Sequence, residues 1–279
     1  MRKCATSQRF VLALLGAACL TSASFAGAWT QRQGGYYFKI ASSTLKARSD
    51  LNADGQRMDK PGMGKLEDFS LTAYLEYGVR DRLTLVASAP YKRLSDERTF
   101  DTGIGRERDS HLADLEARLR WQWRAQPAVV SFAAGAKIPL GYEIRDDSNV
   151  PLGTDEVDGD IRLLLGRSLY PLPAYLTGEL GYRIRGGAFS NEWFSSMEAG
   201  FSWRRLLFKG TVSSVRTFGT CGSTSQAGLI GDQNILKLAP GAIYRLSDRV
   251  EASLDFFHIA SGCNTTTGNT LSLGVAFKR

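Results

Sequence analysis

Histidine is the side chain that most often serves as a general base, and the chain has two histidines, His111 and His258. Acyl hydrolysis needs a serine hydroxyl within hydrogen-bond reach of such a base. Residues two apart on a strand share a face, but Ala260 stands two residues after His258 and Ser261 falls on the opposite face. Ser110 directly precedes His111, so it also points away. We therefore predict no catalytic residues, and a hydrolase stays as an alternative.

Cysteines and carboxylates are the other candidates for chemistry. None of the four cysteines forms a C-x-x-C pair, and no histidine pair lies near them, so a metal centre is not indicated. Clustered carboxylates in the segment 141–160 could hold calcium. Their spacing matches no known calcium loop, and a solvated acidic loop is the simpler interpretation. We expect no metal and no cofactor.

A row of charges at every second position is the clearest pattern in the chain. Asp114, Glu116, Arg118 and Arg120 alternate with the apolar residues of the segment 113–124. A helix would scatter these charges around its axis, whereas a strand places them on one face. Both signs on one face suit a wet interior lined with ion pairs.

The N-terminus indicates export. Arg2, Lys3 and Arg9 form a basic region, and the apolar run 10–20 that follows is too short to span a bilayer as a helix. Small residues then fit a cleavage site, so residues 1–26 are predicted to be a signal peptide and residues 27–279 the mature domain. A lipoprotein signal ending at Cys19 is an alternative.

Removal of the signal peptide changes two other interpretations. It removes three basic residues and no acidic one, so the net charge falls from +7 to +4, and no basic block points to nucleic acid. Cys221 and Cys263 then remain, and two cysteines in an oxidising compartment indicate a disulfide.

Period-two alternation recurs through the mature chain and predicts about twelve strands. The predicted strands are 35–45, 66–78, 82–94, 112–124, 128–140, 159–169, 174–185, 193–204, 206–217, 234–246, 249–260 and 269–278. Short turns alternate with long polar loops along the chain. The predicted long loops are 46–65, 95–111, 141–158, 186–192, 218–233 and 261–268. This alternation is typical of transmembrane β-barrels with short periplasmic turns and long outer loops.

Aromatic residues recur at the short-turn ends of these strands and predict an interfacial girdle. They are Tyr77, Trp121, Trp123, Tyr170, Trp203, Tyr244 and Phe277. Pro90 and Pro240 fall inside predicted strands, where each removes a ladder donor, so we expect a bulge or an early strand end at both.

A soluble barrel would put its apolar face inside, but twelve strands would then leave a large unfilled lumen. The sequence therefore predicts an all-β fold, an antiparallel transmembrane β-barrel in a Gram-negative outer membrane, with outer-membrane lipids as its surroundings.

Three segments also resemble a known family. The stretches 76–85, 113–121 and 134–141 resemble strand–turn–strand segments of the outer-membrane barrels associated with the meta-cleavage pathway of phenol degradation. The resemblance covers the central third of the chain, and it implies passive uptake or transport with no catalytic residues. His111 to Asp114 depart from the family's glycine-rich strand entry. Phe277 is followed by two basic residues instead of ending the chain.

Together these patterns predict passive passage of small solutes, hydrophobic or aromatic compounds among them, through a narrow charged lumen. The alternatives are a structural or surface-interaction barrel with a plugged lumen, and an outer-membrane lipid-modifying hydrolase. The predicted lumen-lining residues are Asp114, Glu116, Arg118, Arg120, Glu179, Arg183, Arg185, Glu251 and Asp255.

The mature N-terminus is the first testable point. If residues 1–26 are a cleavable signal peptide, the intact mass of the membrane-extracted protein should correspond to a chain that begins near Gly27 or Trp29. An acylated Cys19 at the N-terminus would instead establish the lipoprotein alternative.

Overall fold

The computed structural model describes residues 27–60, 64–100, 103–142, 152–222 and 231–279. The predicted signal peptide lies outside the described residues, as do parts of the first, second, third and fifth long loops, including residues 143–151 of the acidic segment. The described part of the chain holds no helix long and apolar enough to cross a membrane.

Every described secondary-structure element is a β-strand, as the alternation predicts. The bounds are β1 Tyr36–Leu51, β2 Arg57–Asp59, β3 Lys65–Arg80, β4 Leu83–Phe100, β5 Gly103–Leu112, β6 Asp114–Arg124, β7 Val129–Pro139, β8 Asp158–Ser168, β9 Ala174–Ile184, β10 Glu192–Trp203, β11 Leu206–Thr217, β12 Asn234–Arg245, β13 Val250–Cys263 and β14 Thr265–Lys278.

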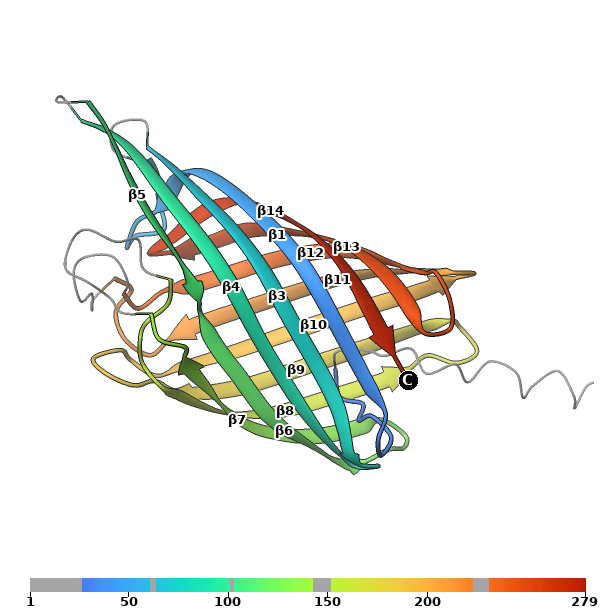
Figure 1. The fold of residues 1–279 in the computed structure, drawn as a ribbon. Coiled ribbons are helices and arrows are strands. Elements are labelled where there is room, and N and C mark those ends of the chain that lie inside the picture. Colours follow the sequence, from blue (N-terminus) through green and yellow to red (C-terminus); the bar gives the residue numbers. More distant parts are fainter. Residues whose placement is uncertain (1–26, 61–63, 101–102, 143–151, 223–230) are drawn as a thin grey trace, which may run out of the picture.

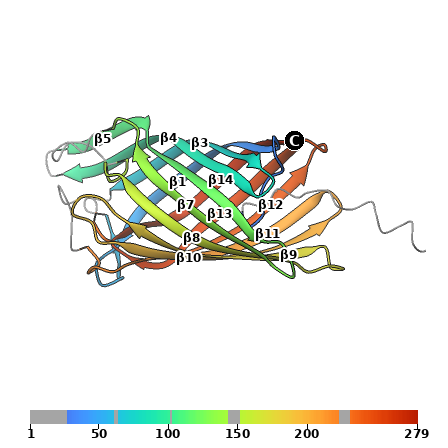
Figure 2. The ribbon, with the colours of Figure 1, turned by 90° about the horizontal axis from the view of Figure 1, so that it is seen from below.

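Twelve of these strands form a closed antiparallel barrel, which confirms the predicted fold (Figures 1 and 2). Each strand pairs with its neighbour in the chain, and the last strand, β14, pairs with β1 from Tyr37↔Lys278 to Leu51↔Thr265. Closure leaves no unpaired sheet edge, which is the condition for a β-sheet in hydrocarbon. β2 and β5 are additions at the end of the barrel that carries the long loops.

The predicted loop 95–111 is largely a hairpin instead. β4 continues to Phe100 and pairs with β5, and the two strands extend beyond the rest of the barrel in Figure 1. Between β5 and β6 the strand is interrupted at Ala113, whose N–H donates to the carbonyl oxygen of Pro90 at 2.8 Å. β4 itself runs through Pro90, which pairs with Thr72 of β3 without a register shift, so the expected bulge or strand end at this proline was wrong.

At Pro240 the expectation was wrong. β12 runs through this residue, which pairs with Gly210 of β11, and the register with β13 is the same on both sides of it. The only shift between β12 and β13 lies at Leu236/Lys237. Pro240 lacks an N–H donor, and the β12–β13 ladder has no residue pair between Leu238↔His258 and Gly241↔Asp255.

The two faces of the barrel differ as membrane barrels require. Large apolar side chains are exposed on the outside, and the seven predicted girdle aromatics are all among the exposed residues. Buried polar and charged side chains, including Glu76, Arg120 and Asp255, lie on the inside. Below, the end of the barrel with the long loops is called the long-loop end, and the opposite end the short-turn end.

The disulfide predicted from composition is present. Cys221 and Cys263 are bonded, with Cα atoms 6.2 Å apart, and they join the loop before β12 to the end of β13. The two cysteines are 42 positions apart in the sequence, and the segment that the bond closes contains β12 and β13. Such a cross-link restricts the unfolded chain more than the folded one.

Replacing both cysteines with serine should lower the free energy of unfolding by roughly 2–4 kcal/mol in the chain-entropy account. The heat-dependent shift of the folded band on gels should then occur at a lower temperature. Reductant should lower the transition of the wild type to that of the double variant and leave the variant unchanged. Equal transitions for all three samples would contradict a stabilising bond.

Candidate functional site: the charged lumen

The nine charged residues predicted from alternation all lie on the inward face of the wall, and each has a partner of opposite charge. Arg118 contacts Asp160 at 3.2 Å, and Asp255 lies 3.1 Å from Lys39 and 3.0 Å from Lys209. The other predicted residues are paired in the same way. Charges held in a lumen of reduced dielectric need such partners.

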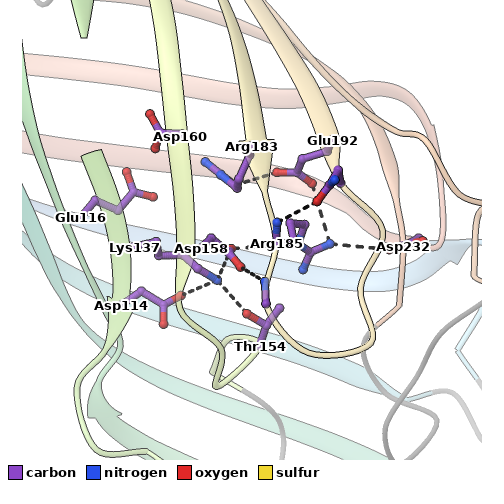
Figure 3. Close-up of polar contacts among 12 residues, drawn as sticks. Asp114, Glu116, Lys137, Thr154, Asp158, Asp160, Arg183, Arg185, Glu192 and Asp232 are labelled. Atoms are coloured by element: carbon purple, nitrogen blue, oxygen red, sulfur yellow. Dashed lines mark hydrogen bonds and ion pairs between the residues drawn. The ribbon is translucent and has the colours of Figure 1, made fainter. Parts of the chain in front are cut away.

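At the long-loop end of the lumen, one connected group of ion pairs follows the wall from β7 to the loop before β12 (Figure 3). Lys137 of β7 contacts Asp158 at 2.9 Å, and Arg185, just after β9, lies between Asp158, Glu192 and Asp232 at 3.7–4.0 Å. Asp232 is fully buried, and its Oδ1 also accepts the N–H of Ser190 at 3.0 Å. This group therefore ties the loop before β12 to β7, β8 and β10 of the wall.

Tyr142, which follows β7, extends this group toward the third long loop. Its hydroxyl donates to a carboxylate oxygen of Asp114 and accepts the N–H of Asp155 at 3.1 Å. Burial, together with the Asp114 carboxylate, raises the pKa of the Tyr142 phenol. The phenol therefore keeps its proton and remains the donor of this hydrogen bond.

The middle of the lumen has charges on two opposing walls. On one wall, Asp160 contacts both Arg118 and Arg162, the latter at 2.6 Å. On the other, Lys39 and Lys209 share Asp255. A cavity of about 330 Å³ lies beside this second group. It is lined by Tyr37, Lys39, Ala41, Ser43, Thr72, Tyr74, Tyr175, Glu198, Lys209, Ile243, Asp255, Phe257 and Ser272.

The short-turn end is crossed by the segment that precedes β1, residues 27–33, which we call the N-terminal strap. Ala28 is fully buried, and its carbonyl oxygen accepts the hydroxyl of Ser131 on β7. The carbonyl oxygen of Trp29 accepts a hydrogen bond from Arg120 Nη1 at 2.9 Å. The Gln31 N–H donates to Thr84 Oγ1 at 2.8 Å.

Glycine allows the strap to approach the wall closely. A Cβ at Gly78 of β3 would lie 1.8 Å from the carbonyl oxygen of Arg32, far inside van der Waals contact. On β8, a Cβ at Gly166 would lie 2.9 Å from the Trp29 ring. The Trp29 ring also meets Tyr175 edge-on, with centroids 6.2 Å apart. The strap therefore packs against the wall as a fitted part of the lumen.

Sequence reasoning missed the strap and most of the ion-pair partners. Partners such as Lys39, Glu76, Asp160 and Lys209 occupy inward positions of other predicted strands, so the alternation itself would have found them. The strap had no comparable signal, because residues 27–33 show no periodicity and carry no motif.

The hydrolase alternative needs a serine hydroxyl next to a histidine, and the described residues do not bring the two together. His258 lies on the outside of β13, and its Nδ1 is 2.8 Å from Oδ1 of Asn269. The alternation predicts Ser261 on the opposite face from His258, but the bulge at Leu236/Lys237 places it opposite Leu236, on the same exposed side as His258. Within the described residues, no serine hydroxyl forms a hydrogen bond with either histidine, and no group of side chains could hold a metal ion.

Solved outer-membrane proteins share this fold. The COG4313 outer membrane channel from Pseudomonas putida F1 matches with a TM-score of 0.68 and 14% identity, over 91% of this chain and 99% of that chain. The translocator domain of the autotransporter NalP from Neisseria meningitidis matches with 0.55 and 11%, over 89% and 90%. The NanC porin matches with 0.52 and 8%, over 86% and 100%.

At these identities the similarity concerns the fold alone. No protein-family model and no curated protein sequence matches the chain. The chain thus has the twelve-stranded fold of outer-membrane β-barrels. The link to phenol degradation stays a prediction.

The fit between strap and wall can be tested at Gly78. In Gly78→Ala the new methyl group collides with the Arg32 carbonyl group. Overpacking of this kind costs roughly 1–3 kcal/mol, so amides of the strap should exchange about five- to a hundredfold faster. Hydrogen exchange followed by mass spectrometry of the peptide covering residues 27–35 measures this.

Gly210→Ala is the matched control, because a Cβ at Gly210 of β11 has nothing within 4 Å. Strap exchange in this variant should equal that of the wild type. Unchanged exchange in Gly78→Ala would show that the strap does not rest on the wall at this point.

Proposed function

We propose that the protein is an outer-membrane channel that allows passive passage of small solutes through a narrow charged lumen. The observation that carries the proposal is the polar interior. The barrel encloses a cavity of about 330 Å³, with paired acidic and basic side chains in its wall. The COG4313 channel and the NanC porin share this fold, which supports the proposal at the level of the class.

Nine residues are proposed to line the pathway, as predicted from the sequence. Arg118 and Arg120 were expected to form its basic wall. Both are paired with carboxylates, and Arg120 also holds the strap, so their charges are largely neutralised locally. Their proposed role is to keep the lumen in shape and to hold the strap across the short-turn end.

A plugged structural barrel is the second candidate. The strap favours it, because it crosses the lumen and meets β3, β4, β6, β7 and β8. The connected ion pairs at the long-loop end favour it as well. The two candidates differ in whether the strap yields to a passing solute.

Single-channel conductance in planar bilayers separates them. The wild type should conduct small ions at a low level, and Gly78→Ala, which displaces the strap, should conduct several-fold more. Gly210→Ala should behave as the wild type. Absence of conductance in all three would favour the structural barrel, provided that heat-dependent gel shifts show that each is folded.

A further inference from the structure

Lysine side chains enter the lumen from several strands, and most of them meet an acceptor. Those that lie within ion-pair distance of a carboxylate are Lys39, Lys137, Lys209 and Lys278. Lys92 donates to the carbonyl oxygen of Leu152 at 3.4 Å. Lys237 differs from all of these, because no described carboxylate lies within ion-pair distance of it. Its ammonium group lies over the Phe257 ring, 5.4 Å from the centroid.

The direction of Lys237 follows from the register of β12. A Cβ at Gly241, four residues further along this strand, would lie 2.4 Å from Oδ1 of Asp255 inside the lumen. Residues an even number apart share a face, so Lys237 also faces inward. Its paired neighbours on the adjoining strands, Ser213 and Ile259, carry no charge. No neighbouring side chain in the ladder neutralises the ammonium group.

Phe257 connects this ammonium group with the cavity in the middle of the lumen. The ring lies beneath Lys237 and also lines the cavity, together with Tyr37, Tyr74, Tyr175 and Ile243. The four charged residues in the cavity wall balance one another. They are two cations and two anions, Lys39, Lys209, Asp255 and Glu198. Lys237, which adjoins this cavity through Phe257, therefore has no counter-charge among the described residues.

The cavity has the size and lining of a small-ligand site. Such sites usually measure about 300–1,000 Å³ and combine apolar and aromatic walls with a few polar groups. Lys237 stands two residues, or about 6.8 Å, nearer the long-loop end than the level of Phe257. A solute that enters from this end meets the ammonium group before the aromatic wall.

We propose that Lys237 and the adjoining cavity form a binding site for an aromatic anion, such as an aromatic carboxylate. The carboxylate would accept a hydrogen bond from the Lys237 ammonium group, and the ring would lie against Phe257 and the tyrosines. The inference deepens the proposed function, on which it rests, by naming the class of solute that the lumen selects.

Calorimetric titration of the full barrel in lipid nanodiscs tests this site, with benzoate as the anion and benzyl alcohol as its neutral counterpart. Lys237→Met should weaken benzoate binding by about tenfold or more, since the charged hydrogen bond is lost. Lys237→Arg should retain binding. Benzyl alcohol should bind the wild type and Lys237→Met equally.

Lys46→Met is the matched control. It removes a lysine at the rim of β1, where the side chain is 72% exposed and pairs with Glu67 at 3.6 Å. Benzoate binding should be unchanged in this variant. Circular dichroism and the heat-dependent gel shift should show the same folded barrel in every variant.

The proposed binding site would be contradicted if benzoate did not bind the wild type, or if it bound the wild type and Lys237→Met equally. Benzoate entry into liposomes, measured in parallel, tests passage separately. If benzoate binds through Lys237 but does not enter liposomes, the site stands and the proposed passage fails. If benzoate enters liposomes equally through the wild type and Lys237→Met, passage stands without this site.

Discussion

Closure of the hydrogen-bonded ladder is the constraint on which the rest of this structure depends. In hydrocarbon each backbone N–H and C=O group needs a partner within the protein, so β14 must return to β1. Once the sheet is closed, successive side chains point alternately to lipid and to the lumen. The apolar side chains of each strand then face lipid, and the charged side chains that alternate with them face the interior.

The enclosed charges in turn determine the electrostatic field inside the lumen. Desolvated ions are stable only beside opposite charges, and the partners come from the adjacent strand or the next one along the wall. A lumen in which nearly every charge is compensated has little net field of its own. In the proposed channel, selectivity would depend on the few groups that are left uncompensated and on the shape of the space beside them.

The sequence allowed the strands and the inward rows of charge to be predicted, because a period of two is a local property of the chain. The twelve strands and the Cys221–Cys263 bond followed from this pattern and from composition. The side on which Ser261 lies did not, because one extra residue in β13 reverses the alternation after it. The direction of Lys237 could be predicted from alternation, but its lack of a partner depends on three strands together.

The strap depends on contacts that no local pattern encodes. Ala28 is buried because Ser131, Val129 and Leu164 surround it, and these residues come from strands far along the chain. A short stretch of small and polar residues would ordinarily predict a free terminus. Burial by distant partners is the reason that sequence reasoning placed nothing at the short-turn end of the lumen.

The position of the strap also bears on how the barrel can deform. The strap contacts described above lie on six adjoining strands, from β3 to β9. These strands are therefore braced from within by a segment of the same chain, in addition to the ladder that joins them. Any change in the curvature of this part of the wall must also displace the strap.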